Sequence, residues 1–319
     1  MVQLKMKYRY DALGLKILSE ICLPELSEWK EQNDKPLIEI VKRDLYNVWS
    51  TFDEKSRKRY MVDMNQIMFE VPETAIFSIE DGKRIVVSPS NGAEEDKIRL
   101  YILGTCIGAV LIQKKILALH GSAVVIDGKA YAFIGESGAG KSTIATALMN
   151  KGYPLLSDDI IPIHFYEDTP FVIPTYPQQK LWQESLEQFG MDSLHLSPLF
   201  ERETKFSVPV RSNFFNQPLP LAGVFELSKT DIRKCKVNGV KGLQQFPILF
   251  KHTFRNIFIT AMGLRDWHFS ESARLVKKIS MYQLQRPFIG FNTDQLVELI
   301  LTSIEMENDA DGYRVSTQN

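Results

Sequence analysis

The sequence is poor in cysteine and has no excess of either charge. Its 319 residues contain only Cys22, Cys106 and Cys235, which are far apart. Three scattered cysteines indicate neither a disulfide framework nor a metal cluster, so we expect a cytoplasmic protein in a reducing environment. The formal net charge of −1 provides no basic surface for nucleic acid or for an anionic membrane. We therefore expect neither as a partner.

Long hydrophobic runs are also lacking. Residues 1–7 include two lysines, but no long apolar stretch follows, so we expect no signal peptide. An uncharged, mainly apolar run covers residues 100–112, which is shorter than the roughly 20 residues that a membrane span needs. We interpret residues 94–115 as a helix buried against a sheet. A hydrophobic content of 44% and a charged content of 24% are typical of a globular protein with an ample core.

A phosphate-binding loop is the most informative motif present. Residues 135–142 read Gly-Glu-Ser-Gly-Ala-Gly-Lys-Ser and match the pattern G-x-x-x-x-G-K-[ST] at every fixed position. Such a loop turns backbone N–H groups toward an anion, places its lysine beside the β- and γ-phosphates, and offers its serine hydroxyl to Mg²⁺. The residues predicted to bind nucleotide are Gly135, Glu136, Ser137, Gly138, Ala139, Gly140, Lys141, Ser142 and Thr143.

The segments around the loop support this interpretation. Residues 130–134 are apolar and predict a buried strand, whereas residues 142–151 have helical spacing and end before Gly152, a typical helix terminator. Asp127-Gly128 lies between two apolar runs and predicts a two-residue hairpin. The strand before the loop is therefore expected to follow an antiparallel neighbour, which is unusual for phosphate-loop proteins.

Two adjacent carboxylates follow the predicted helix. Asp158 and Asp159 come after the apolar residues 154–156, which predict a return strand that completes a parallel βαβ unit and carries the pair at its tip. Since adjacent residues on a strand face opposite sides, we expect them to divide two tasks. One would accept the proton of the acceptor hydroxyl and the other would hold Mg²⁺.

Further candidates are weaker. His120 lies in the apolar run that enters the hairpin, where it could steady a phosphate or orient Asp158, although a lone histidine of this kind is more often a core residue. Eight of the fifteen prolines lie in residues 162–220, which favours short strands and loops. We expect that region either to shape the substrate side of the site or merely to connect elements. Its singled-out basic residues are Lys180, Arg202, Lys205 and Arg211.

Patterning elsewhere predicts the remaining elements. The expected strands cover residues 2–10, 15–22, 38–48, 69–73, 74–79, 84–87, 221–227 and 280–284, and the expected helices cover residues 243–262, 267–278 and 294–305. The N-terminal strands are expected to pair mainly antiparallel. We place domain boundaries to give a mainly β domain (1–95), a catalytic domain (96–308) and a frayed polar tail (309–319).

These motifs together resemble a known family. The segment from about residue 117 to 163 is similar to the catalytic domain of bacterial HPr kinase/phosphorylase. The residues that carry the resemblance are His120-Gly121, Asp127-Gly128, the loop 135–142, Lys151-Gly152-Tyr153 and Asp158-Asp159. Residues 23–26 and 282–287 more loosely resemble the HPr-kinase-related proteins encoded with lasso peptide biosynthesis genes.

The resemblance implies an α/β fold with a phosphate-loop kinase domain of the HPr kinase/PEP carboxykinase-like type. It implies an ATP- and Mg²⁺-dependent kinase of a seryl hydroxyl, in the lasso subgroup the C-terminal residue of a precursor peptide. Asp158 would be the general base, Asp159 and Ser142 metal ligands, and Lys141 a catalytic cation, with His120 lining the site. A homo-oligomer is also implied.

Two other functions stay open. The same loop could serve a kinase of a small molecule such as free serine. The chain could instead be a nucleotide-binding switch or scaffold without transfer activity. Asp158 and Asp159 argue against a switch, because a switch needs no base for an acceptor.

Overall fold

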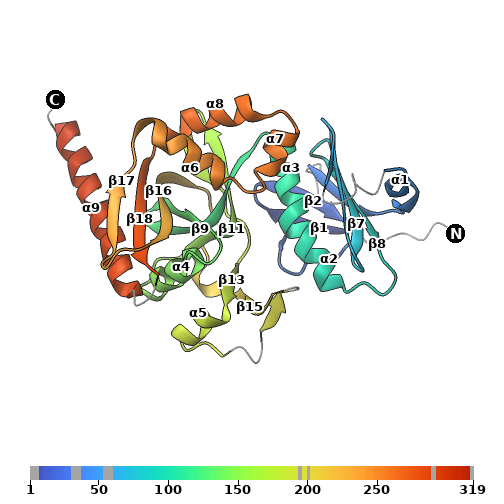
Figure 1. Cartoon of the computed structure of the whole chain (residues 1–319), viewed down its shortest axis with the longest axis horizontal. Coiled ribbons are helices and arrows are strands. Elements are labelled where there is room, and N and C mark those ends of the chain that lie inside the picture. Colours follow the sequence, from blue (N-terminus) through green and yellow to red (C-terminus); the bar gives the residue numbers. More distant parts are fainter. Residues whose placement is uncertain are drawn as a thin grey trace.

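The computed structural model describes residues 7–29, 37–52, 60–192, 196–199, 202–288 and 292–316. One large sheet is built by the N-terminal third of the chain and a second by the remainder, with a small third sheet beside the second (Figure 1). Helices pack on the second sheet, so the expected mixed α/β class holds. None of the helices in these ranges combines the length and apolar character that crossing a bilayer requires.

The N-terminal sheet has its described strands in the order β3-β1-β2-β4-β8-β7-β6-β5. Their bounds are β1 (Tyr8–Ala12), β2 (Leu15–Ser19), β3 (Ser27–Glu28), β4 (Ile38–Lys42), β5 (Met61–Val62), β6 (Gln66–Val71), β7 (Ala75–Glu80) and β8 (Arg84–Pro89). Most neighbours are antiparallel as expected, but β4 runs parallel to both β2 and β8, so the sheet is mixed.

The strand expected over residues 38–48 is too long. It ends at Lys42, and α1 (Tyr46–Ser50) follows. The Asp44 carboxylate accepts a hydrogen bond from the Tyr46 N–H at 2.8 Å, which gives the backbone a partner other than a strand. The strand expected over residues 2–10 is described only from Tyr8, since residues 2–6 lie outside the described ranges.

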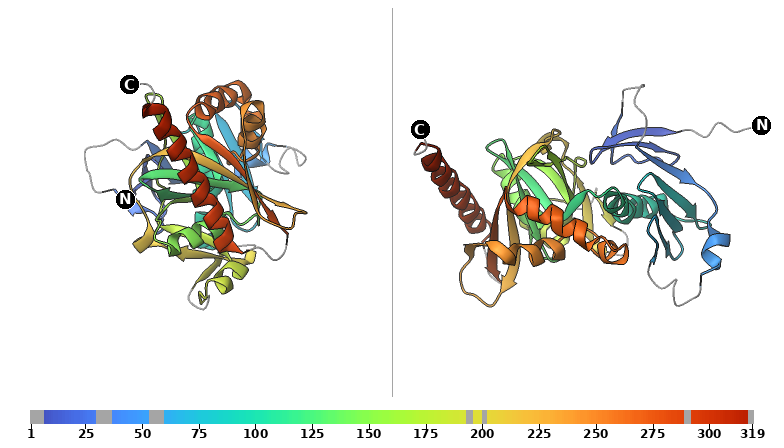
Figure 2. Two further views of the ribbon diagram at one scale, coloured as in Figure 1. Left: turned by 90° about the vertical axis from the view of Figure 1, so that its left-hand side faces the viewer. Right: turned by 90° about the horizontal axis from the view of Figure 1, so that it is seen from above.

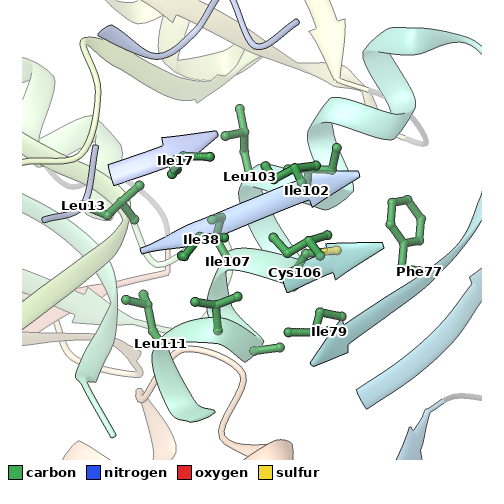
Figure 3. Packing of buried hydrophobic residues seen from close by; sticks show 14 of the residues in the cluster. Leu13, Ile17, Ile38, Phe77, Ile79, Ile102, Leu103, Cys106, Ile107 and Leu111 are labelled. Atoms are coloured by element: carbon green, nitrogen blue, oxygen red, sulfur yellow. The ribbon is translucent and has the colours of Figure 1, made fainter. Parts of the chain in front are cut away.

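A helix covers the N-terminal sheet, as expected for residues 94–115. It comprises α2 (Glu95–Tyr101), the π-helical turn η2 (Ile102–Cys106) and α3 (Ile107–Gln113). Figure 3 shows the apolar side chains of one helix face among those of the strands. These residues are Ile102, Leu103, Cys106, Ile107 and Leu111 from the helix and Leu13, Ile17, Ile38, Phe77 and Ile79 from the sheet side. The boundary near residue 95 stays a prediction.

The second sheet has the order β10-β9-β11-β12-β16-β18-β17, and β16 also pairs with β10. Its strands are β9 (Leu117–Ile126), β10 (Lys129–Gly135), β11 (Leu155–Tyr166), β12 (Thr169–Val172), β16 (Leu219–Thr230), β17 (Lys236–Gly239) and β18 (Ser280–Pro287). Asp127 and Gly128 connect β9 to β10 with φ angles of 49° and 73°, as a type I′ hairpin turn requires. The predicted hairpin is confirmed.

The helix α4 (Lys141–Asn150) leads from β10 to β11. Both strands are antiparallel to β9, so they run in the same direction as the sequence predicts. They are not neighbours, however, because β9 lies between them. This arrangement places the carboxyl end of β10 and the middle of β11 on either side of one strand.

Helices cover both faces of this sheet. One face packs against α4 and α9 (Thr293–Ser316), and the other against α6 (Gln245–Lys251) and α8 (Arg265–Val276). Figures 1 and 2 show α9 at the end of the molecule opposite the N-terminal sheet. The helix extends to Ser316, so its predicted end at residue 305 is wrong. The frayed tail expected from residue 309 stays a prediction, and residues 317–319 lie outside the described ranges.

Two further expectations concern the regions beside this sheet. The helix expected over residues 243–262 is interrupted between α6 and α7 (Ile257–Ala261), where Thr253 pairs with Leu119 of β9. The proline-rich region forms short elements as predicted. They are β13 (Gln178–Trp182), α5 (Gln183–Gln188), β14 (Ser197–Leu199) and β15 (Arg202–Pro209), and the three strands make the third sheet.

The close approach of β9 to β10 gives a testable prediction. A Cβ atom on Gly121 would lie 2.1 Å from the carbonyl oxygen of Phe133, so alanine there must push the strands apart. We expect Gly121→Ala to lower the free energy of unfolding by about 3 kcal/mol, measured by urea denaturation. The control is Gly239→Ala on β17, where a Cβ atom meets nothing within 4 Å. Equal denaturation midpoints for the two variants would contradict the prediction.

Candidate active site

The phosphate-binding loop joins β10 to α4 in the predicted strand–loop–helix order. Gly140 caps α4 with a φ of 110°, which an L residue rarely adopts. A Cβ atom on Gly135 would lie 2.6 Å from the carbonyl oxygen of Leu227, so this position also requires glycine. Lys141 Nζ donates hydrogen bonds to the carbonyl oxygens of Gly135 (2.8 Å) and Glu136 (3.0 Å). Burial, together with nearby Lys205, lowers the pKa of Lys141 to about 8.

Arg286, at the end of β18, donates hydrogen bonds to the backbone of the phosphate-binding loop. Its Nε donates to the carbonyl oxygen of Ala139 at 2.9 Å, and its Nη2 donates to that of Gly138 at 3.3 Å. Arg286 is buried, so this support is shielded from solvent. Sequence reasoning singled out residues 282–287 only for a loose resemblance and missed this contact, which joins residues 147 positions apart.

Asp158 lies beside the start of α4. Its Oδ1 accepts hydrogen bonds from Ser122 Oγ at 2.6 Å and from Ser142 Oγ at 3.2 Å, and its Oδ2 accepts one from the Lys180 backbone N–H at 2.8 Å. The side chain is buried, and burial raises the pKa of Asp158 despite these donors. The predicted metal ligand Ser142 thus contacts Asp158, whereas the predicted partner ligand Asp159 has other contacts.

Asp159 is paired with positive charge. Its Oδ2 lies 2.5 Å from Lys180 Nζ, and its Oδ1 lies 3.4 Å from His120 Nδ1. Burial alone would raise the pKa of Asp159, but Lys180 and His120 outweigh burial and hold the pKa well below its usual range. Conversely, Asp159 holds the pKa of Lys180 above its usual range although burial opposes it. Burial lowers the pKa of His120, whose Nδ1 also lies 2.9 Å from the Asp159 carbonyl oxygen.

The two carboxylates differ from the expected arrangement. They lie within β11 and not at its tip, because the strand continues to Tyr166. They also line the same cavity, although alternation along a strand predicts opposite faces. The reason is that Asp159 has a left-handed φ of 71°, which interrupts the regular strand geometry.

The described residues enclose a cavity of about 580 Å³ over the loop. All the predicted nucleotide-binding residues line it except Ala139, which is buried against the core around α4. His120, Asp158 and Asp159 line it as well, so the sequence-predicted site residues come together. The other lining residues are Leu100, Tyr101, Gly104, Thr105, Gly121, Lys180, Trp182, Ser185, Lys205, Lys251, His252, Thr253, Phe254 and Arg255.

The basic residues of the proline-rich region differ in their positions relative to the cavity. Lys180 and Lys205 line the cavity, whereas Arg211 is exposed and does not line it. A substrate-side role for that region stays a prediction. The side chain of Arg202 lies outside the described ranges. Sequence reasoning also left His252 unassigned. This residue lines the cavity and its Nε2 lies 3.0 Å from Glu226 Oε1 of β16, a contact without any local sequence signal.

Comparison with known proteins supports the sequence resemblance. No family model matches the chain. The chain is 27% identical over 193 residues to the HPr kinase/phosphorylase of Lactobacillus gasseri, which covers 57% of this chain and 58% of the relative. It is 35% identical over 77 residues to that of Mycoplasmopsis pulmonis, covering 24% and 25%. The chain is similar to HPr kinase/phosphorylases. It spans less than two thirds of the length of these two relatives.

Among solved structures, the HPr(Ser) kinase/phosphatase from Coxiella burnetii matches 62% of this chain and 97% of its own, at 13% identity and a TM-score of 0.35. The geometry of the candidate site is given by the contacts within this chain. That geometry depends on the segment between α6 and α7, which forms one cavity wall.

The buried side chain of His268 in α8 contacts Thr253 in that wall. Its Nε2 lies 2.8 Å from Thr253 Oγ1, the Phe250 and Trp267 rings pack around it, and burial lowers its pKa to about 4. In the unfolded chain His268 takes up a proton near pH 6.5, whereas in the folded chain it stays neutral until the pH falls to about 4. The free energy of unfolding should therefore fall by up to about 3 kcal/mol as the pH is lowered from about 6.5 to about 4.

We expect His268→Gln to flatten this pH dependence, because glutamine has no proton to gain. Urea denaturation of the variant and the parent protein at several pH values between 4 and 7 measures the difference. Parallel pH profiles for the two proteins would show that His268 is not the group responsible.

Proposed function

We propose that the protein is an ATP- and Mg²⁺-dependent kinase that phosphorylates a seryl hydroxyl. The observation that carries this proposal is the convergence of Lys141, Ser142, Asp158 and Asp159 on one cavity beside a complete phosphate-binding loop. A loop alone would suit any nucleotide-binding protein. Two carboxylates next to it, the buried Asp158 and the partly buried Asp159, add the groups that phosphoryl transfer needs. The similarity to HPr kinase/phosphorylases supports the same reaction class.

The residues present fit a nucleotide and a divalent cation. Lys141 donates to two loop carbonyl oxygens and can turn these donors to phosphates without leaving the loop. Ser142 and the carboxylates offer the hard oxygen ligands that Mg²⁺ prefers. When bound, ATP would supply the phosphoryl group and Mg²⁺ would spread its charge. The loop residues and the N-terminus of α4 would bind the phosphates.

The carboxylates would have separate roles. We assign the base to Asp158, whose carboxylate would accept the proton of the acceptor hydroxyl. Asp159 would belong to the metal site with Ser142, and His120 would orient Asp159 through the contact to its carboxylate. The hydrogen bond between Ser142 and Asp158 makes the reversed assignment the alternative. Either assignment uses both carboxylates.

The acceptor that we propose is the C-terminal serine of a precursor peptide of the lasso type. Free serine is the second candidate, because both acceptors present a seryl hydroxyl close to a carboxylate. The cavity wall carries Lys180, Lys205 and Arg255, which suits an acceptor with negative charge. Mass spectrometry of each acceptor after incubation with ATP and Mg²⁺ tests the proposal. A protein that binds ATP and phosphorylates neither would instead support a switch or scaffold.

Removing the loop lysine should abolish transfer while the protein stays folded. We expect Lys141→Ala to weaken binding of Mg-ADP by about 10–100-fold, because charged hydrogen bonds to the phosphates are lost. Calorimetric titration measures the affinity. The control is Lys151→Ala at the other end of α4, whose ammonium is exposed and lies 3.7 Å from Asp294. Transfer by Lys141→Ala at ordinary ATP concentration would argue against the assignment.

The carboxylate roles can be separated by kinetics. Asp158→Asn should lower turnover by about 10²–10⁴-fold with little change in nucleotide affinity, since the amide cannot accept the proton. Asp159→Asn should raise the Mg²⁺ concentration needed for half-maximal rate, because an amide is a poorer ligand for a hard cation. Titrations of ATP and Mg²⁺ with each variant measure both effects. The opposite pattern would reverse the roles, and two active variants would remove the carboxylates from the mechanism.

A further inference from the structure

The helix formed by α2, η2 and α3 lines one end of the cavity. Leu100, Tyr101, Gly104 and Thr105 line it, and all four lie in or beside the π-helical turn η2. Ile102, Leu103 and Cys106 from the same turn pack instead into the N-terminal core, as Figure 3 shows. The turn therefore has one structural face and one face toward the site. Single π-helical turns inside α-helices are frequent at functional sites.

Gly104 leaves a space that the fold does not require. The residue is buried and has no positive φ, and a Cβ atom there would meet nothing within 4 Å. Glycine inside a helix lowers the stability of the protein relative to alanine, so a glycine that packing does not require is unfavourable for folding. Gly108, one turn later, differs: a Cβ atom would approach the Phe254 ring to 2.6 Å. Packing explains Gly108, whereas Gly104 opens only onto the cavity.

This end of the cavity adjoins the carboxylates. Phe254 packs against the helix at Gly108, and its ring centroid lies 5.6 Å from that of His120. His120 in turn contacts Asp159. These contacts connect the end of the cavity at the helix to the two carboxylates, and Asp158 lies beside Ser142. The phosphate chain of a bound nucleotide would end near Ser142. An acceptor, and not the base of a nucleotide, belongs at that end of the cavity.

Arg255 supplies a cation at the same end. It lines the cavity, and its Cζ lies 5.4 Å from the centroid of the Phe254 ring. Its Nε is buried and has no hydrogen-bond partner among the described residues. The residue has a left-handed φ of 55°, a conformation that concentrates at ligand sites when the residue is not glycine. A guanidinium in this state is suited to bind a carboxylate.

We propose that Gly104, Tyr101 and Arg255 form the acceptor subsite, in which Gly104 provides the space for a serine and Arg255 binds the carboxylate next to its hydroxyl. The inference rests on the proposed kinase function for its reaction, but binding at the subsite does not require transfer. It gives the helix that covers the N-terminal sheet a direct role at the site. A serine inside a polypeptide lacks this carboxylate and would bind poorly.

Calorimetric binding of a short alanine peptide that ends in serine tests the subsite, with the peptide as free acid or as amide and with free L-serine as a third probe. We expect the acid to bind about 10–100-fold more tightly than the amide, the range for a charged hydrogen bond. Arg255→Gln should remove this preference, and Arg255→Lys should keep part of it. Arg265→Gln on α8, away from the cavity, should change nothing.

Gly104→Leu should weaken binding of the acid peptide by tenfold or more while Mg-ADP affinity and thermal stability are retained, because the Cβ position meets no atom within 4 Å and Gly104 lines the cavity. Gly104→Ala should have a smaller effect, and Gly239→Leu none. Binding of L-serine but not of the peptide assigns the subsite to the free amino acid. Failure of all three probes to bind, equal affinity for acid and amide, or unchanged binding by Gly104→Leu overturns the subsite. Binding without any transfer overturns the kinase function alone.

Discussion

The site depends on the pairing of β9 with a strand on each side. β9 bonds to β10, which delivers the phosphate-binding loop, and to β11, which delivers the carboxylates. Gly121 faces Ile134 on one side and Asp159 on the other. The hairpin at Asp127-Gly128 fixes the first register, and the second register shifts between Leu155 and Ser157, before the carboxylates. Because both distances across β9 are set by backbone hydrogen bonds, the loop and the carboxylates meet without adjustment by flexible side chains.

Local signals explain what the sequence could predict. The turn at 127–128, the glycines of the loop and the termination of α4 each depend on a few adjacent residues, and each is found where predicted. Lys180 and Arg286 depend instead on contacts across 21 and 147 residues, which no spacing rule reports. The left-handed Asp159 was missed because non-glycine residues rarely adopt that conformation. Alternation along β11 therefore gave the wrong faces for the carboxylates.

The N-terminal part of the chain is more than a separate β domain beside the site. Its sheet holds one face of the helix formed by α2, η2 and α3, and the opposite face closes the cavity. The segment 252–255 fills the space between this helix and β9, with Phe254 against both Gly108 and His120. A shift of the N-terminal sheet would therefore move the cavity wall. This coupling could not be predicted from sequence, because residues 100–112 look uniformly apolar and only packing separates their two faces.

The ion pair between Asp159 and Lys180 decides how the carboxylates can act. Both side chains are mostly but not fully buried, with 17% of Asp159 and 11% of Lys180 exposed, and removing one partner of a fully buried pair typically costs about 3–5 kcal/mol. If Asp159 holds Mg²⁺ as proposed, Lys180 would have to move toward another anion, such as a bound phosphate. The three hydrogen bonds given above for Asp158 come instead from hydroxyl and backbone N–H donors. The proposed metal role of Asp159 therefore requires that Lys180 leave this carboxylate.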